Sequence, residues 1–212
     1  MKTTVLDLFA TPVIETQFDA HRKYEAEFGN WEKRDRKPEQ WHVPLNTSFP
    51  DVGPDDPYVS PDVVDSLKKD IMFQVKKVML SNKMPTDLEY TSFWYNAYYE
   101  GQGQEPHNHL TVDGQDPFWC GVYFAKNCFP GTFYFVRTEY SHRTQQSFNH
   151  QNTPLRQYYE EFYPTPYCDG HLILFPPHLH HSVKVGAPNK SEQRLTFSFN
   201  LSHTNETYSR DT

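Results

Sequence analysis

Two histidine clusters have the types and spacing needed for metal chemistry: residues 107–109 (His-Asn-His) and residues 178–181 (His-Leu-His-His). Side chains in an extended segment alternate between two faces, so the imidazoles of His107 and His109 are expected on one face. Two such imidazoles can hold one metal ion, and the second cluster can add a third ligand. Three ligands leave positions open on iron for a co-substrate and oxygen. The other six histidines are scattered, and we interpret them as exposed or singly hydrogen-bonded.

The residues before the first cluster form a longer pattern. Tyr98, Gly101, Gln102, Pro106 and His107 follow one another with the order and spacing Tyr-x-x-Gly-Gln, a few residues, then Pro-His. This pattern resembles that of the prolyl-4-hydroxylase-like 2-oxoglutarate/Fe(II) oxygenases. Segments 118–124, 131–135, 170–183 and 194–200 are similar to the core strands that follow in that family. The opening residues 8–12 resemble the start of a little-characterised branch, with His-x-His in place of His-x-Asp.

The resemblance implies a set of metal ligands. His107 matches the first ligand of the family, and His109 stands where the family has a carboxylate. Among His178, His180 and His181, the resemblance selects His181, because it is the histidine of Phe-Pro, four residues, His-Ser-Val. The implied centre is Fe(II) bound by His107, His109 and His181, with no further catalytic residue.

Arg194 is the candidate for binding the co-substrate. An arginine on a strand beside the metal can hold a dicarboxylate through a bidentate, charge-assisted pair. Thr196 lies two residues further on the same strand face and can add a hydroxyl. The resemblance adds phenol groups from Tyr98 and Tyr123, and it implies that these four residues bind 2-oxoglutarate. Two more residues share the strand parity of Tyr98 and are expected in the pocket: Trp94 and Asn96.

The reaction implied by the resemblance consumes 2-oxoglutarate and O₂. It hydroxylates a C–H bond of a protein residue or small molecule and releases succinate and CO₂. Two alternatives stay open. One is a three-histidine cupin-type dioxygenase that needs no 2-oxoglutarate. The other is a non-catalytic jelly-roll binding module whose histidines hold a structural metal or none.

Composition narrows the class of partner. The 212 residues carry a formal net charge of -7 and contain no run of Lys or Arg, which makes nucleic acid an unlikely ligand.

Three cysteines at unpatterned spacing argue against a disulfide framework. The first residues do not resemble a signal peptide, and no apolar run is long enough to span a membrane. We expect a soluble cytoplasmic protein without membrane contact, and a homodimer stays open.

Apolar spacing predicts one long helix and several strands. Ser60 and Pro61 suit the start of a helix that ends before Pro85. Its apolar stripe consists of Val64, Leu67, Ile71, Val75 and Val78. Strands are expected near 3–16 and at 88–98, 118–124, 131–136, 170–175, 181–185 and 194–201. A helical turn or two is expected within 21–28, and an irregular loop at 46–61. The resulting fold class is mainly β with flanking helices, and the resemblance makes it a double-stranded β-helix (jelly roll).

The expected organisation has three parts. Residues 1–87 form an N-terminal strand, a Pro-rich loop and a supporting helix. Residues 88–203 form the catalytic core, with residues 137–168 inserted near one rim. Residues 204–212 form a tail.

Overall fold

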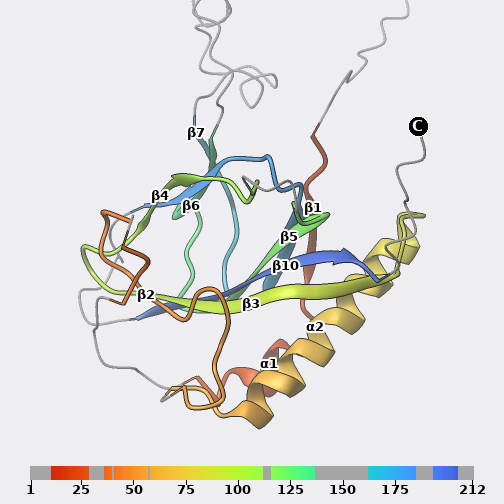
Figure 1. The fold of residues 1–212 in the computed structure, drawn as a ribbon, viewed down its shortest axis with the longest axis horizontal. Coiled ribbons are helices and arrows are strands. Elements are labelled where there is room, and N and C mark those ends of the chain that lie inside the picture. The colour runs from red at the N-terminus through yellow and green to blue at the C-terminus, as the bar shows by residue number, and fades with distance from the viewer. Residues whose placement is uncertain are drawn as a thin grey trace, which may run out of the picture.

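The computed structural model describes residues 11–28, 36–39, 41–56, 58–111, 116–136, 162–184 and 193–204. Within these ranges the chain forms two β-sheets, and the two helices lie beside the larger sheet (Figure 1). All strand pairs within the sheets are antiparallel. None of the helices in these ranges has the length and apolar character needed to span a membrane.

The larger sheet has six strands in the order β1-β8-β5-β10-β3-β2, and the smaller has four in the order β4-β9-β6-β7. The strands of the larger sheet are β1 (Ile14–Gln17), β8 (His171–Phe175), β5 (Trp119–Lys126), β10 (Arg194–His203), β3 (Leu88–Tyr98) and β2 (Asn46–Thr47). Those of the smaller sheet are β4 (Gln104–His107), β9 (His181–Val183), β6 (Phe133–Val136) and β7 (Phe162–Pro164). Strands β1 and β2, from the expected N-terminal region, therefore pair with strands of the expected core.

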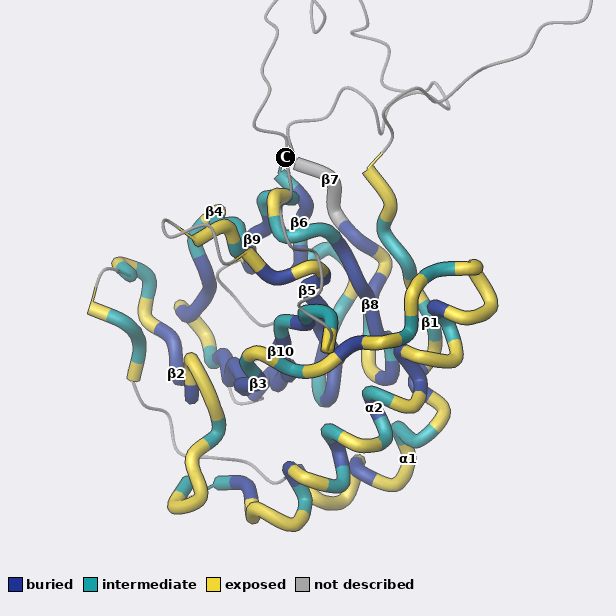
Figure 2. The backbone as a smooth tube through the Cα atoms, turned by 45° about the vertical axis from the view of Figure 1, so that its right-hand side comes forward, coloured by how far each residue is buried: buried dark blue, intermediate teal, exposed yellow. Residues whose placement is uncertain are grey.

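Helix α2 (Pro61–Ser81) covers one face of the six-stranded sheet, and the short helix α1 (His21–Tyr24) lies beside it. The Ser60 hydroxyl accepts a hydrogen bond from the backbone N–H of Val63 at 3.4 Å, and Pro61 is the first helical residue, as the sequence predicts. The buried face of α2 consists of Val64, Leu67, Ile71, Gln74, Val75 and Met79. Figure 2 shows the exposed turns of α2 in yellow and the central strands in dark blue.

Side-chain alternation divides the six-stranded sheet into two faces. Leu195, Phe197 and Phe199 of β10 belong to the core on the helix side. Arg194, Thr196 and Ser198, which alternate with them, line a cavity on the opposite side, toward the four-stranded sheet. Period-two alternation thus places apolar side chains of β10 in the core and polar side chains of the same strand in the cavity.

Two expectations about the elements need correction. Residues 46–61 were expected to be irregular, but Asn46 and Thr47 pair with Ala97 and Asn96 as strand β2. The expected insertion 137–168 contains β7, which pairs with β6, and it ends in the buried residues Thr165 and Tyr167. The strand expected near 3–16 is present in the described part of that segment as β1, whereas residues 1–10 and 137–161 lie outside the described ranges.

Candidate active site

Three histidines converge where the two sheets face each other. His107 is the last residue of β4 and His181 is the first of β9, and the two are register partners in the smaller sheet. His109 follows two residues after His107. One ligand-type nitrogen from each ring lies within 4.8 Å of the others, which suits a single metal ion. The structure therefore brings together the three residues that the sequence proposes as metal ligands.

Hydrogen bonds set the orientation of each imidazole. Nδ1–H of His107 donates to the carbonyl oxygen of Glu105 at 2.7 Å, and Nδ1–H of His181 donates to that of Leu179 at 3.1 Å. Nδ1–H of His109 donates to Oδ1 of Asn200 at 2.6 Å. Because each partner is an oxygen that only accepts, the proton is fixed on Nδ1 and the lone pair is on Nε2. This is the second layer of contacts that metal-binding histidines usually have.

Burial keeps these histidines neutral. Loss of hydration, together with the neighbouring His107, lowers the pKa of His109 to about 4. Burial likewise lowers the pKa of His107, and it holds the pKa of His181 well below the ordinary value of 6.5. A neutral imidazole is the form that binds a metal, so the site needs to release no proton near neutral pH.

The other end of the cavity holds a buried cation. Arg194 is only 5% exposed, and its Nε and Nη2 have no hydrogen-bond partner among the described residues. Its guanidinium lies 4.3 Å from the ring centre of Tyr98, its register partner on β3. A cation–π contact offsets only part of the cost of burying a charge, so the free donors are available for an anion.

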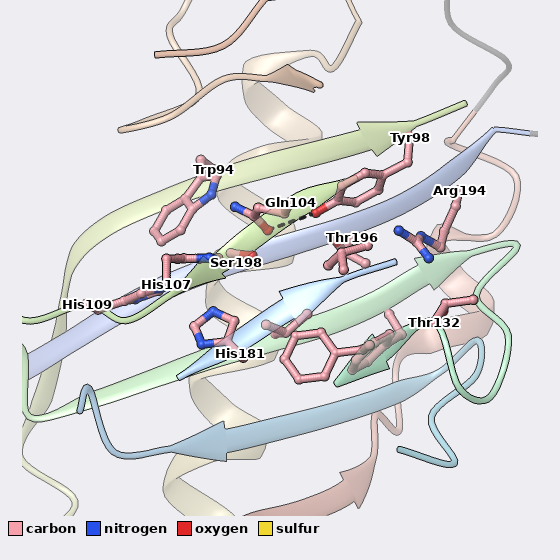
Figure 3. A pocket seen from close by; sticks show the side chains of 14 residues that line it. Trp94, Tyr98, Gln104, His107, His109, Thr132, His181, Arg194, Thr196 and Ser198 are labelled. Carbon is pink, nitrogen blue, oxygen red and sulfur yellow. Dashed lines mark hydrogen bonds between the residues drawn. The ribbon is translucent and has the colours of Figure 1, made fainter. Parts of the chain in front are cut away.

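One cavity joins the two ends. Figure 3 shows His107, His109, His181 and Trp94 at one end and Arg194 at the other, with Thr196 between them. The Tyr98 hydroxyl donates to Oε1 of Gln104 at 3.1 Å. The described residues that line the cavity include no Asp or Glu. The lining is therefore suited to a metal cation held by neutral ligands and to an anion held by arginine.

Tyr123 does not reach this cavity, which corrects its expected role. It lies on β5 between Val122 and Phe124, which do line the cavity, so its own side chain points to the opposite face. There it is fully buried in the core on the helix side, and its hydroxyl lies 2.7 Å from Nδ1 of His21. The structure thus makes Tyr123 part of the core rather than of the candidate site.

The remaining described candidates lie outside the metal cluster or outside the cavity. His178 is exposed, and Nε2 of His180 lies 3.2 Å from Nδ2 of Asn108 rather than in the metal cluster. Asn96 is buried and donates to Ser198 at 3.1 Å without lining the cavity. Asp113, the first carboxylate after His109 in the sequence, lies outside the described residues.

Sequence reasoning missed four polar residues of the site: Gln104, Thr132, Ser198 and Asn200. Two of them carried a usable signal. Ser198 and Asn200 continue the alternation that begins at Arg194 and Thr196, so the same face of β10 should have been followed to its end.

The sequence matches a family model described as "Putative 2OG-Fe(II) oxygenase" over residues 92–200, just over half of the chain. The chain belongs to this oxygenase family. The family uses Fe(II), 2-oxoglutarate and O₂, and this confirms the activity class and cofactors implied by the sequence. A comparison with curated proteins found none that matches the sequence.

Solved structures confirm the jelly-roll fold of the oxygenase. HygX from Streptomyces hygroscopicus, with nickel and 2-oxoglutarate bound, is similar with a TM-score of 0.55 at 14% identity, covering 92% of this chain and 84% of that one. A Pseudomonas putida prolyl-4-hydroxylase has a TM-score of 0.50 at 11% identity, covering 92% and 94%. A 2OG-Fe(II) oxygenase family oxidoreductase from Burkholderia pseudomallei has a TM-score of 0.51 at 13% identity, covering 90% and 84%.

Proposed function

We propose that this oxygenase binds Fe(II) through Nε2 of His107, His109 and His181, and binds the far carboxylate of 2-oxoglutarate through Arg194. The observation that carries the proposal is that both features share one cavity. Three neutral, correctly oriented imidazoles occupy one end, and a buried guanidinium with unused donors occupies the other. The donor atoms of each end suit the group assigned to it: imidazole nitrogens for the metal and guanidinium N–H groups for the carboxylate.

Arg194 is well placed to select a dicarboxylate. Its planar guanidinium can present two parallel N–H donors to one carboxylate, whereas lysine presents a single ammonium. Thr196 lies on the same face of β10, and the ring of Tyr98 restricts the guanidinium from its other side. These three residues form the anion-binding end in our proposal, and Tyr123 is not part of it.

The three imidazoles add no negative charge to the centre. When bound, Fe(II) and 2-oxoglutarate supply the oxidising chemistry, which consumes O₂ and releases succinate and CO₂. The protein orients both groups and limits access of water with the apolar side chains of Val122, Phe124, Phe133 and Val183. Arg194 is protonated, and the described residues that line the cavity include no Asp or Glu. The cavity therefore favours anions.

The prime substrate in this proposal is a C–H bond of a protein residue or a small molecule. Named relatives include both kinds of enzyme: one HygX structure contains hygromycin B, and the Pseudomonas putida protein is a prolyl-4-hydroxylase. The acidic composition supports a substrate other than nucleic acid, and three cysteines at unpatterned spacing are typical of a reducing compartment such as the cytoplasm.

Metal analysis and 2-oxoglutarate turnover test the proposal. The wild-type protein should retain one equivalent of Fe(II) after desalting, and both His107→Ala and His181→Ala should lose it while keeping the circular dichroism spectrum. Succinate should form in step with loss of 2-oxoglutarate. Oxygen uptake without 2-oxoglutarate would instead favour a three-histidine dioxygenase of the cupin type. Full iron binding in either alanine variant would remove that residue from the metal site.

A further inference from the structure

Three aromatic side chains form a continuous series beside the histidines, and we call Trp41, Phe49 and Trp94 the aromatic wall. The Trp41 ring centre lies 5.9 Å from that of His107 and 6.1 Å from that of Phe49. Phe49 lies 5.1 Å from Trp94, which in turn lies 5.7 Å from His109. In Figure 3, Trp94 is at the histidine end of the cavity, away from Arg194. Trp94 lines the cavity at the end that Arg194 does not occupy, and Phe49 and Trp41 continue the wall from Trp94 back to His107.

Hydrogen bonds hold the segment that carries Trp41 against the metal centre. Oε1 of Glu105 accepts from the backbone N–H of His42 at 2.6 Å and of Val43 at 2.7 Å. The carbonyl oxygen of Glu105 also accepts Nδ1–H of His107 at 2.7 Å. One residue thus fixes both a candidate ligand and the residues that directly follow Trp41.

The other two rings are also held in place. Trp94 is part of β3. The backbone N–H of Phe49 donates to Oγ1 of Thr47 at 3.2 Å, and this hydroxyl lies 2.8 Å from Oδ1 of Asn96 on the same strand. A wall whose rings are already ordered loses little conformational entropy when a ligand packs against it.

Two groups in the wall lack the contacts that such groups usually have. Phe49 is 42% exposed although it is a large apolar ring. Trp94 is 3% exposed, and its Nε1 has no hydrogen-bond acceptor among the described residues. A buried indole N–H normally finds a partner, and one left without it costs free energy. A ligand with an apolar surface and an acceptor atom would satisfy both groups.

We propose that the aromatic wall binds the prime substrate, and that the group bound there is an uncharged ring with a hydrogen-bond acceptor beside it. This rests on the proposed function, because the wall matters for catalysis only if the three histidines hold the metal. The ring packs against Trp41 and Phe49, and the acceptor atom takes the N–H of Trp94. This places the reacting group next to His107 and His109.

Charge decides against ionic substrates. Aromatic faces attract cations, but a cation here would share the cavity with a divalent metal and Arg194, and the described lining holds no acid to offset them. An anion would lose its hydration against three rings in return for the single donor of Trp94. An uncharged ring meets neither penalty.

Small probes test the wall without knowledge of the natural substrate. We would load the full-length protein with Mn(II) and 2-oxoglutarate and titrate benzamide (ring and acceptor), toluene (ring only), acetamide (acceptor only) and benzylamine (ring and cation). Saturation-transfer NMR measures binding, and relaxation of probe protons by Mn(II) shows whether the probe lies near the metal. Benzamide should bind most tightly, and its protons should relax strongly.

Variants assign the contacts. Trp41→Ala and Phe49→Ala should each weaken benzamide binding by roughly two- to tenfold, the range expected for loss of one aromatic contact. Trp94→Phe should weaken benzamide and leave toluene unchanged. Phe73→Ala removes a ring that is 72% exposed on α2 and serves as the matched control, with no effect on any probe. Mn(II) affinity, measured by electron paramagnetic resonance, should be the same in all four variants.

The outcomes separate the two proposals. Benzamide binding that is insensitive to Trp41→Ala, Phe49→Ala and Trp94→Phe, or benzylamine binding tighter than benzamide, would overturn the role of the wall. Absence of Mn(II) binding in the wild type would instead refute the metal centre, and the saturation-transfer titrations of metal-free protein would still decide the wall.

Discussion

Replacing Arg194 by methionine should stabilise the ligand-free protein and remove most of its affinity for 2-oxoglutarate. The side chain is 5% exposed, burial lowers its pKa, and two of its nitrogens have no partner in the described part of the chain. Among the described residues, the ring of Tyr98 at 4.3 Å offsets part of the cost of burying this charge. Methionine keeps an unbranched apolar stem against that ring and carries no charge.

The size of the stability change follows from two opposing free energies. An uncompensated buried ion costs several kcal/mol even after relaxation, and a desolvated cation–π contact returns about 2 kcal/mol. We expect the free energy of unfolding of the ligand-free protein to rise by about 1–3 kcal/mol in Arg194→Met, or roughly 3–10 °C in Tm. With 2-oxoglutarate present the sign reverses. Leaving its carboxylate without a partner costs about 3–5 kcal/mol, a loss in affinity of a hundredfold or more.

Two measurements are needed. Urea denaturation of metal-free protein gives the stability change, and anaerobic calorimetry of Fe(II)-loaded protein gives the affinity for 2-oxoglutarate. Arg194→Lys should recover only part of the affinity, because an ammonium cannot present two parallel donors. Fe(II) binding should stay unchanged in both variants. A less stable Arg194→Met variant that binds 2-oxoglutarate as tightly as the wild type would show that Arg194 is a structural residue.

Four further outcomes are expected. His109→Ala should lose Fe(II) by metal analysis, whereas His109→Asp should retain it, because it restores a two-histidine, one-carboxylate set. Asn200→Ala should weaken metal affinity by about 10- to 100-fold in a competition titration with a chelator, because the orientation of His109 is lost. The metal-free protein should lose stability as pH falls from 6.5 to about 4, because His109 binds a proton in the unfolded chain but stays neutral when it is buried. His109→Gln should lessen this loss, as measured by denaturation midpoints across that pH range. Tyr123→Phe should leave the 2-oxoglutarate affinity unchanged and lower the free energy of unfolding by about 1 kcal/mol, through loss of the contact with His21.

Local patterns were enough to predict the long elements. Helix α2 starts at Pro61 after the Ser60 cap, and β3 has the predicted bounds Leu88–Tyr98. Strands β2 and β4 could not be predicted, because they exist through their partners. Strand β4 contains Pro106 and has weak β-propensity, and it is a strand because β9 lies beside it. Strand β2 has only two residues and forms against β3.

The site was predictable to the extent that spacing and alternation define it. Local spacing was enough to predict His107, His109 and Arg194 as site residues. The resemblance selected His181 among three candidate histidines. The same resemblance misplaced Tyr123, because alternation along β5 turns its side chain to the helix side. Trp41 and Phe49 precede the core strands in irregular segments. No periodicity places them beside the metal centre, and only the contacts of the folded chain do so.

The two ends of the cavity belong to different sheets. His107 and His181 come from the four-stranded sheet, whereas Arg194 comes from the six-stranded sheet, and the His109–Asn200 contact crosses between them. A molecule bound at both ends therefore resists separation of the sheets, in addition to any effect on the stability of either sheet alone. The free energy of such a local opening should rise with the logarithm of ligand concentration over Kd. Ligand occupancy of the site would then determine how often the two sheets open locally and expose the interior between them to solvent.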